Sequence, residues 1–141
     1  MSFNKLKSRI KKNEGYSNKP YKDQLGFYTI GYGHLIRPYE KKYFKIKYKK
    51  KHFDELFEAD FKKSLKAYKD IFKKEHHKQN EKELLVEMIF QLGKDGASNF
   101  QKMIYYLNRK QKYMVCLEML DSLWYKQTPK RVENLIDNFI K

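Results

Sequence analysis

The sequence is poor in cysteine, in proline and in long apolar runs. Its single thiol, Cys116, cannot form an internal disulfide, so the chain is not a scaffold held together by disulfides. No apolar run is long enough to cross a bilayer, and the N-terminal residues lack the apolar region of a signal peptide. We therefore expect a protein that is made in the cytoplasm and does not insert into membranes.

Metal-binding patterns are also missing. The four histidines, at positions 34, 52, 76 and 77, do not have the spacing of metal ligands. No metal site is predicted, and the lone Cys116 among apolar neighbours indicates a small buried hydrophobe rather than a nucleophile.

Positive charge is what the sequence has in excess. It carries 32 Lys and Arg against 17 Asp and Glu, a net charge of +15 over 141 residues. Such a field attracts polyanions such as nucleic acid, an anionic membrane or an acidic wall polymer. The same excess of lysine would also arise if the organism used lysine widely on the solvated surfaces of its proteins.

The charge is concentrated in residues 36–51, where seven lysines alternate with aromatic and aliphatic residues. Alternation over residues 44–48 predicts an exposed strand. Basic residues with interleaved aromatics can grip a nucleic-acid strand, or they can form a cationic rim facing any polyanion. We favour the rim and expect no specific nucleic acid, because no DNA- or RNA-binding motif accompanies the segment.

Periodicity predicts an α+β fold in a single domain, residues 1–141. Apolar spacing predicts a helix that ends near Gly15, a long helix from Phe53 to Phe72 and about four later helices, one of which stops at Gly93. Two strand-like runs around Gly26 predict a β-hairpin with a three-residue connection. We expect a small lobe over about residues 14–52, a helical lobe of 1–13 plus 53–141, and a cleft between them.

Two acids and a hydroxyl fall where the first helix meets this hairpin. Glu14 follows Ile10 by one turn, so it projects from the apolar face, where partial desolvation favours its protonated form. Asp23 ends the first strand run and Thr29 lies in the second. Each residue also has an ordinary structural explanation. Glu14 could be a solvated residue at a helix end, Asp23 a turn residue and Thr29 a β-branched strand residue. Together they suit acid–base hydrolysis.

Several motifs in order resemble one known family. They are Glu14-Gly15, Tyr21-Lys22-Asp23, the run from Gly26 to Leu35, the run from Met88 to Gly93, and the run from Trp124 to Arg131. The chain resembles the phage-type lysozymes, the muramidases of glycoside hydrolase family 24. The resemblance implies a lysozyme-like fold and hydrolysis of the β-1,4 bond between N-acetylmuramic acid and N-acetylglucosamine in peptidoglycan, without a cofactor.

The resemblance also implies catalytic roles. Glu14 would be the general acid that protonates the glycosidic oxygen. Asp23 would stabilise the oxocarbenium-like transition state and, with Thr29, hold the attacking water. Such an inverting mechanism requires carboxyls roughly 6.5–9.5 Å apart.

Supporting residues carry over in the same way. His34 would pair with Asp60 on the long helix, a structural role that accounts for an acid in an apolar stripe. Arg131 would approach Glu14, where a cation favours the ionised carboxylate while burial favours the protonated one, so the net effect stays open. The cleft would be lined by Leu35, Phe90 and Gln91.

The chain also departs from the family pattern. The segment between His34 and Asp60 is shorter than in the T-even phage members, so we expect a trimmed small lobe without a helix. The sequence given stops soon after Ile140, and two sugar-contacting positions, Met103 and Glu118, do not match.

Biologically, the resemblance implies a monomeric endolysin for bacterial lysis. It would stay in the host cytoplasm until a holin gave it access to the cell wall or periplasm. A domain of a phage tail or a bacterial toxin fits the same residues. The alternative from another class is a non-catalytic lysozyme-fold module that binds wall glycan or nucleic acid.

Overall fold

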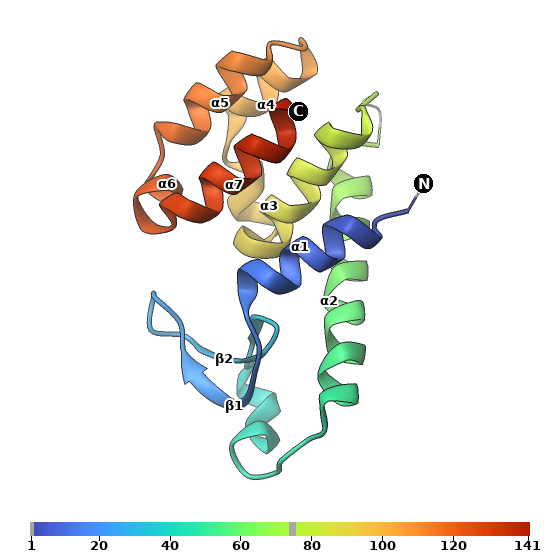
Figure 1. The fold of residues 1–141 in the computed structure, drawn as a ribbon, viewed down its shortest axis with the longest axis vertical. Helices are drawn as coiled ribbons and strands as arrows, with labels where there is room; N and C mark the ends of the chain where they lie inside the picture. Colours follow the sequence, from blue (N-terminus) through green and yellow to red (C-terminus); the bar gives the residue numbers. More distant parts are fainter. Residues whose placement is uncertain (1, 74–75) are drawn as a thin grey trace. The chain divides into compact units, whose positions relative to one another are not determined.

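A computed structural model describes residues 2–73 and 76–141 (Figure 1). It confirms the α+β class, with a small antiparallel sheet and otherwise mainly helices. The chain divides into two compact units, Met1–Lys63 and Ser64–Lys141, and the division falls inside the long helix α2 (Lys50–Ile71). The length of α2 agrees with the helix predicted from Phe53 to Phe72.

The first unit begins with α1 (Asn4–Glu14). Leu6 and Ile10, one turn apart, are fully buried, as the apolar spacing predicted. Lys11 and Lys12 in the last turn complement the negative end of the helix dipole. The amide of Gly15 donates to the carbonyl of Lys11 at 3.0 Å and ends the helix, so Glu14 is its last residue.

The sheet has the strand order β1-β2-β3, with β1 at Ser17–Lys22, β2 at Tyr28–Gly31 and β3 at His34–Leu35. The amide of Asp23 donates to the carbonyl of Phe27 at 2.8 Å, which closes the predicted three-residue connection. The register of β1 and β2 is interrupted between Ser17 and Tyr21. Pro20 lies in this interruption, where its missing N–H leaves no ladder bond unmade.

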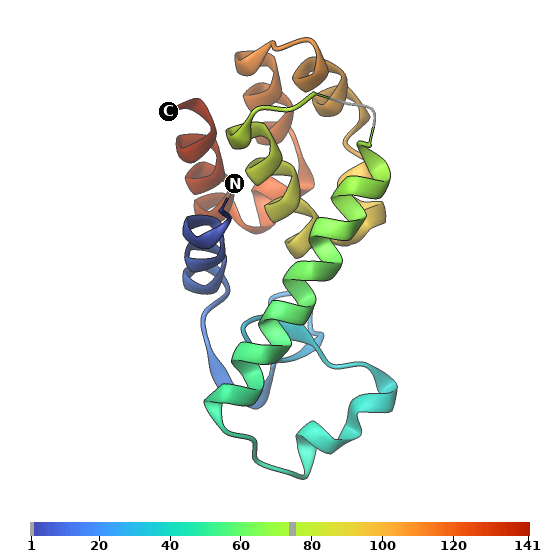
Figure 2. The same cartoon turned by 90° about the vertical axis from the view of Figure 1, so that its right-hand side faces the viewer.

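Two expectations for the lysine-rich stretch are wrong. The small lobe does contain a helix, the 3₁₀ helix η1 (Pro38–Phe44), and residues 44–48 form no strand. Pro38 starts η1, where its fixed φ favours a helical turn. Tyr43 is 3% exposed while its neighbour Phe44 is 50% exposed, so one aromatic anchors the segment and the next faces outward. Figure 2 shows this cyan segment swinging away from α2 before returning to its N-terminus.

The first unit has its own apolar core. Ile30 of β2, Tyr43 of η1 and Phe53 of α2 are buried together. Half-buried residues pack against them: Ile36, Tyr48 and Leu56. The sheet, η1 and the start of α2 are therefore joined by one hydrophobic cluster, which fixes the hairpin that carries the predicted catalytic residues.

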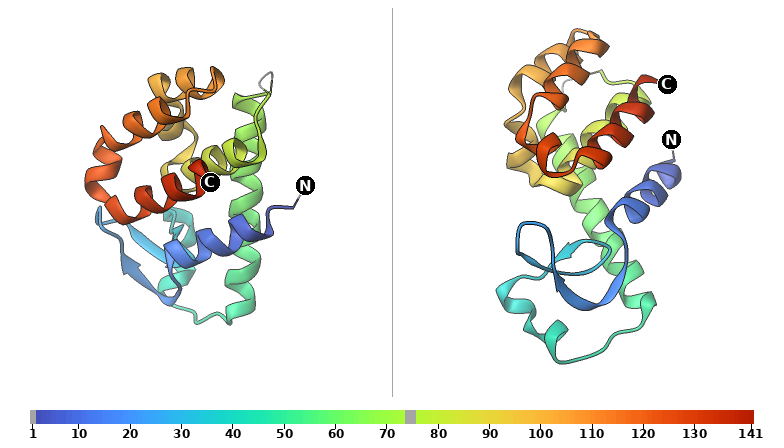
Figure 3. Two further views of the ribbon diagram at one scale, coloured as in Figure 1. Left: turned by 45° about the horizontal axis from the view of Figure 1, so that its top comes forward. Right: turned by 60° about the vertical axis from the view of Figure 1, so that its left-hand side comes forward.

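The second unit is helical: α3 (Gln79–Ser98), α4 (Gln101–Asn108), α5 (Lys112–Leu120), α6 (Leu123–Gln127) and α7 (Pro129–Ile140). Gly93, where a helix was expected to stop, has non-helical dihedrals, φ 80° and ψ 168°, so α3 consists of two helical segments that meet in a kink at this residue. α7 packs on α3, α5 and α6 (Figure 3). Its apolar stripe of Val132, Leu135 and Phe139 is buried. Among residues 2–73 and 76–141, no helix has the length and apolar character needed to cross a membrane.

Candidate active site

Glu14 lies against the turn that joins β2 to β3. A Cβ added to Gly33 would collide with the carboxylate oxygen Oε2 and with Cδ of Glu14. Gly33 also has φ +74°, a conformation that other residues rarely adopt. The turn therefore requires glycine for two reasons, and the half-buried Glu14 carboxyl is held beside its backbone.

Asp23 occupies the hairpin connection and fixes its shape. Its Oδ1 accepts hydrogen bonds from the amides of Leu25 and Phe27, both at 2.9 Å. Asp23 is thus a turn residue, which was the structural alternative to a catalytic role in the sequence analysis. This does not conflict with a catalytic role, because the turn uses Oδ1 and leaves Oδ2 out of these bonds.

Tyr21 is affected by the charges of both acids, and the sequence did not indicate this role for it. Burial raises the pKa of the Tyr21 phenol, and the negative charges of Glu14 and Asp23 raise it further. The charges of both carboxylates therefore act on the same phenol. The available signal was the alternation that puts Tyr21 and Asp23 on one face of a strand.

Thr29 stands directly across from Tyr21 in the β1–β2 register, and Leu35 stands across from Thr29 in β3. Directly opposed residues share a face of a sheet, so these three side chains lie on one face. Thr29 is 5% exposed, and its Oγ1 donates to the carbonyl of Phe27 at 3.1 Å. With that proton committed, the lone pairs of Oγ1 can accept a hydrogen bond from water.

His34 is held from both sides by acids. Its Nδ1 lies 2.8 Å from Oδ2 of Asp60, the pairing expected from the sequence. Its Nε2 lies 3.1 Å from both carboxylate oxygens of Glu40, which no sequence pattern indicated. Burial by itself would lower the pKa of His34, but bonding and attraction to Asp60 and Glu40 outweigh burial and raise it.

The Gly31–Gly33 turn is clamped through Tyr32. The Nζ of Lys11 lies 4.9 Å from the Tyr32 ring centroid, and that of Lys50 lies 5.7 Å from it. Lys50 in turn bonds Asp54 at 3.0 Å, and the ring of Tyr16 lies 5.0 Å from that of Tyr32. Cations over aromatic faces stabilise such arrangements. The clamp ties α1, the turn and α2 together next to Glu14.

The other predicted residues belong to the second unit. Gln91 of α3 uses both ends of its amide, because Oε1 accepts from Nε1 of Trp124 at 3.0 Å and Nε2 donates to Oγ1 of Thr128 at 3.4 Å. Phe90 beside it is half-buried. Arg131 of α7 lies 3.6 Å from the fully buried carboxylate of Glu87. No sequence pattern indicated the pairing of Arg131 with Glu87.

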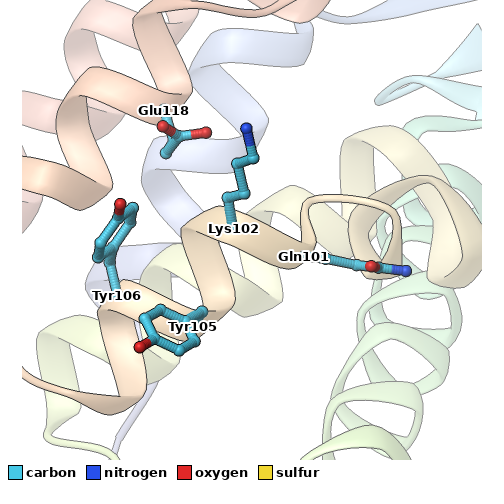
Figure 4. A pocket seen from close by; sticks show the side chains of 5 residues that line it. All are labelled: Gln101, Lys102, Tyr105, Tyr106 and Glu118. Atoms are coloured by element: carbon cyan, nitrogen blue, oxygen red, sulfur yellow. The ribbon is translucent and has the colours of Figure 1, made fainter.

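A pocket of about 420 Å³ lies in the second unit between α4 and α5. Figure 4 shows Lys102 and Tyr106 of α4 extending toward α5, which carries Glu118. The remaining lining residues are Gln101 and Tyr105. None of the nine predicted site residues lines this pocket. Within the described parts of the chain, no group of three His, Cys, Asp or Glu could hold a metal ion.

The His34 arrangement predicts a window of maximal stability. Because the pKa of His34 is raised in the folded protein, His34 contributes fully to the free energy of unfolding below pH 6.5. This contribution is lost as the pH rises through the pKa of His34 in the folded state. The pKa of Glu40 is lowered, since bonds from the Arg37 amide and His34 outweigh burial. Glu40 therefore contributes fully to the free energy of unfolding above pH 4.5, and this contribution is lost as the pH falls through its lowered pKa.

Glu40→Gln should lower the His34 pKa and cost roughly 1–3 kcal/mol of unfolding free energy near pH 6. The difference in unfolding free energy between the variant and the parent protein should become smaller as the pH rises above the folded-state pKa of His34. NMR titration of His34 and urea unfolding across pH measure both effects, with Glu55→Gln as the exposed control. An ordinary His34 titration in the parent protein would contradict the prediction.

Gly33→Ala should displace the Glu14 carboxyl and cost about 1–3 kcal/mol through backbone strain. Gly26→Ala is the matched control, because Gly26 also has positive φ, +87°, while an added Cβ there meets nothing within 4 Å. Unfolding measurements should show strain in both variants, and crystal structures should show movement of Glu14 in Gly33→Ala alone. A Glu14 carboxyl left in place in that variant would refute the contact.

Comparison with known proteins agrees with the family resemblance seen in the sequence. The sequence model of the family described as Phage lysozyme matches residues 11–138, a range that includes Glu14, Asp23 and Thr29. A curated relative named "Probable T4-type lysozyme 2", from Dictyostelium discoideum, is 29% identical over 95% of this chain and 92% of its own length. "Probable T4-type lysozyme 1" of the same organism is 28% identical over 93% and 91%. The chain therefore belongs to the phage lysozyme family.

Proposed function

We propose that the protein is a muramidase that cleaves the β-1,4 bond between N-acetylmuramic acid and N-acetylglucosamine in peptidoglycan. Membership of the phage lysozyme family supports a lysozyme-type glycoside hydrolase. The bond and the mechanism rest on the residues of the first unit. The observation that carries the proposal is the position of the Glu14 carboxyl against Gly33 in the turn of the same sheet whose hairpin connection holds the Asp23 carboxylate on two backbone amides.

In this mechanism Glu14 donates a proton to the glycosidic oxygen as the bond breaks. Its position at the end of α1, beside the backbone of Gly33, fixes the direction in which that proton is delivered. A general acid must be held in this way, because proton transfer requires hydrogen-bond distance to the leaving oxygen.

Asp23 and Thr29 act on the other side of the reaction. The Asp23 carboxylate, held by two backbone amides, stabilises the positive charge of an oxocarbenium-like transition state. Its Oδ2 and the lone pairs of Thr29 Oγ1 orient the attacking water. Attack from the face opposite the leaving group inverts the anomeric carbon, and roughly 6.5–9.5 Å between the carboxyls leaves room for that water. Leu35, on the same sheet face as Thr29, contacts the sugar.

Residues of the second unit complete the proposal. Phe90 and Gln91 contribute to glycan binding, and Gln91 is oriented for this by Trp124 and Thr128. Arg131, which lies 3.6 Å from the carboxylate of Glu87, has a supporting role. His34 and Asp60 have a structural role.

The cellular role follows as part of the same proposal. A monomeric endolysin would remain in the host cytoplasm until a holin opened the membrane, and it would then lyse the cell by degrading the wall. The high positive charge would speed its encounter with an anionic envelope.

Glu14→Gln should reduce clearance of a suspension of bacterial walls by about 10²- to 10⁴-fold, because the amide cannot donate the required proton. Turbidity measures the rate, and circular dichroism checks that the variant folds. Glu55→Gln, an exposed acid of the same unit, is the matched control and should retain full activity.

Failure would take two forms. Equal clearance by Glu14→Gln and the parent would remove Glu14 from the mechanism. A folded parent that binds purified peptidoglycan but releases no fragments would instead identify a non-catalytic wall-binding module.

The stereochemistry gives an independent test. An inverting enzyme acting on a β-linked substrate releases the α anomer first. Proton NMR of fresh digests of purified glycan strands should show α-configured N-acetylmuramic acid reducing ends before mutarotation. Initial release of the β anomer would exclude the single-displacement role of the Asp23-bound water.

A further inference from the structure

The lysine-rich stretch has no part in the proposed reaction. Residues 37–51, here called the basic segment, contain eight cations and one acid, a net +7 of the +15 carried by the whole chain. All eight cationic side chains are exposed. The one acid, Glu40, is turned inward to His34 and the Arg37 amide, and one of the eight cations, Lys50, bonds Asp54 of α2.

The basic segment is anchored from below by aromatic side chains. Tyr43 is buried, and its hydroxyl lies 2.7 Å from Nε2 of His52. The ring of Tyr48 stacks on His52 at 4.3 Å between centroids. Because these inner rings belong to the core of the first unit, the segment presents its charges from a defined backbone rather than from a solvated tail.

Apolar side chains face outward among these charges. Tyr39 is 81% exposed, Phe44 50% and Ile46 54%. The Phe44 ring packs edge-on against exposed Tyr28 at 5.1 Å, and Lys22 lies over Tyr28 at 5.4 Å. The outward surface therefore combines cations with aromatic and aliphatic groups, and it continues from the basic segment onto the hairpin.

This combination identifies a kind of partner. A purely polar polyanion neutralises lysines but offers nothing apolar to Ile46. Nucleic-acid bases stack on aromatic rings, yet an aliphatic side chain gains little from stacking. The boundary between lipid headgroups and acyl chains accepts both kinds of group, since phosphate attracts lysine and the acyl region takes apolar side chains.

We propose that the basic segment docks the protein on the surface of anionic lipid membranes. The protein would lie on the bilayer, with the lysines at the phosphates and Tyr39, Phe44 and Ile46 in the interface. This inference does not depend on the muramidase proposal, because none of the predicted catalytic residues belongs to the segment.

The test uses co-sedimentation with vesicles of phosphatidylcholine alone and of phosphatidylcholine mixed with phosphatidylglycerol. The parent protein should bind the mixed vesicles and lose that binding as salt is raised. Lys45→Gln, Lys47→Gln and Lys49→Gln together should weaken binding on the order of 100-fold. The matched control removes three exposed lysines of α2, Lys62→Gln, Lys66→Gln and Lys69→Gln, and should change binding only slightly.

A second variant separates lipid from other polyanions. Tyr39→Ser with Ile46→Ser keeps every charge and should weaken vesicle binding roughly tenfold by removing apolar contact with the interface. Binding to inorganic polyphosphate should be unchanged in the same variant. Thermal unfolding confirms that each variant folds.

Three results would overturn the proposal. Equal binding to both vesicle types would remove the need for anionic lipid. Equal losses in the two lysine triples would show an effect of total charge rather than of the basic segment. Unchanged vesicle binding by the Tyr39/Ile46 variant would reduce the surface to a general polyanion site.

Discussion

The contact between the end of α1 and the β2–β3 turn is the constraint on which the proposed site depends. Glu14 is the last helical residue, where small changes in helix length or direction would redirect its carboxyl. The structure prevents this by placing the carboxyl against a backbone that has no side chain at position 33. Tyr32, gripped by Lys11 and Lys50, keeps that backbone in position. A large part of the first unit thus serves to orient one acid.

Asp23 shows how one residue can serve the fold and the site together. Its hydrogen bonds to two amides shape the hairpin connection, and the same bonds hold its carboxylate still. Preorganised charge stabilises a transition state without reorganisation during the reaction. In the proposed mechanism, stability and chemistry are therefore coupled at Asp23.

Three of the acids of the first unit are paired with cations of the same unit, and two of these acids face inward to His34. Glu40 and Asp60 hold His34, and Asp54 bonds Lys50 and lies 3.7 Å from Lys11. Lysines 45, 47 and 49 remain exposed. A large share of the positive charge counted from the composition is therefore located on one surface, that of the basic segment.

The sequence by itself determined the α+β class, the extent of α2, the hairpin with its three-residue connection and the identity of Glu14, Asp23 and Thr29 as candidates. These features depend on periodicity, turn residues and motif order, which are properties of neighbours along the chain. It misjudged residues 44–48 as a strand, because packing of Tyr43 into the core overrode the local alternation. Only the tertiary structure decided that the charges of Glu14 and Asp23 both act on the Tyr21 phenol, that Glu40 joins His34 and that the Glu14 carboxyl lies against Gly33. Those contacts join residues from separate elements, and which of them form is settled when the core closes and brings the elements together.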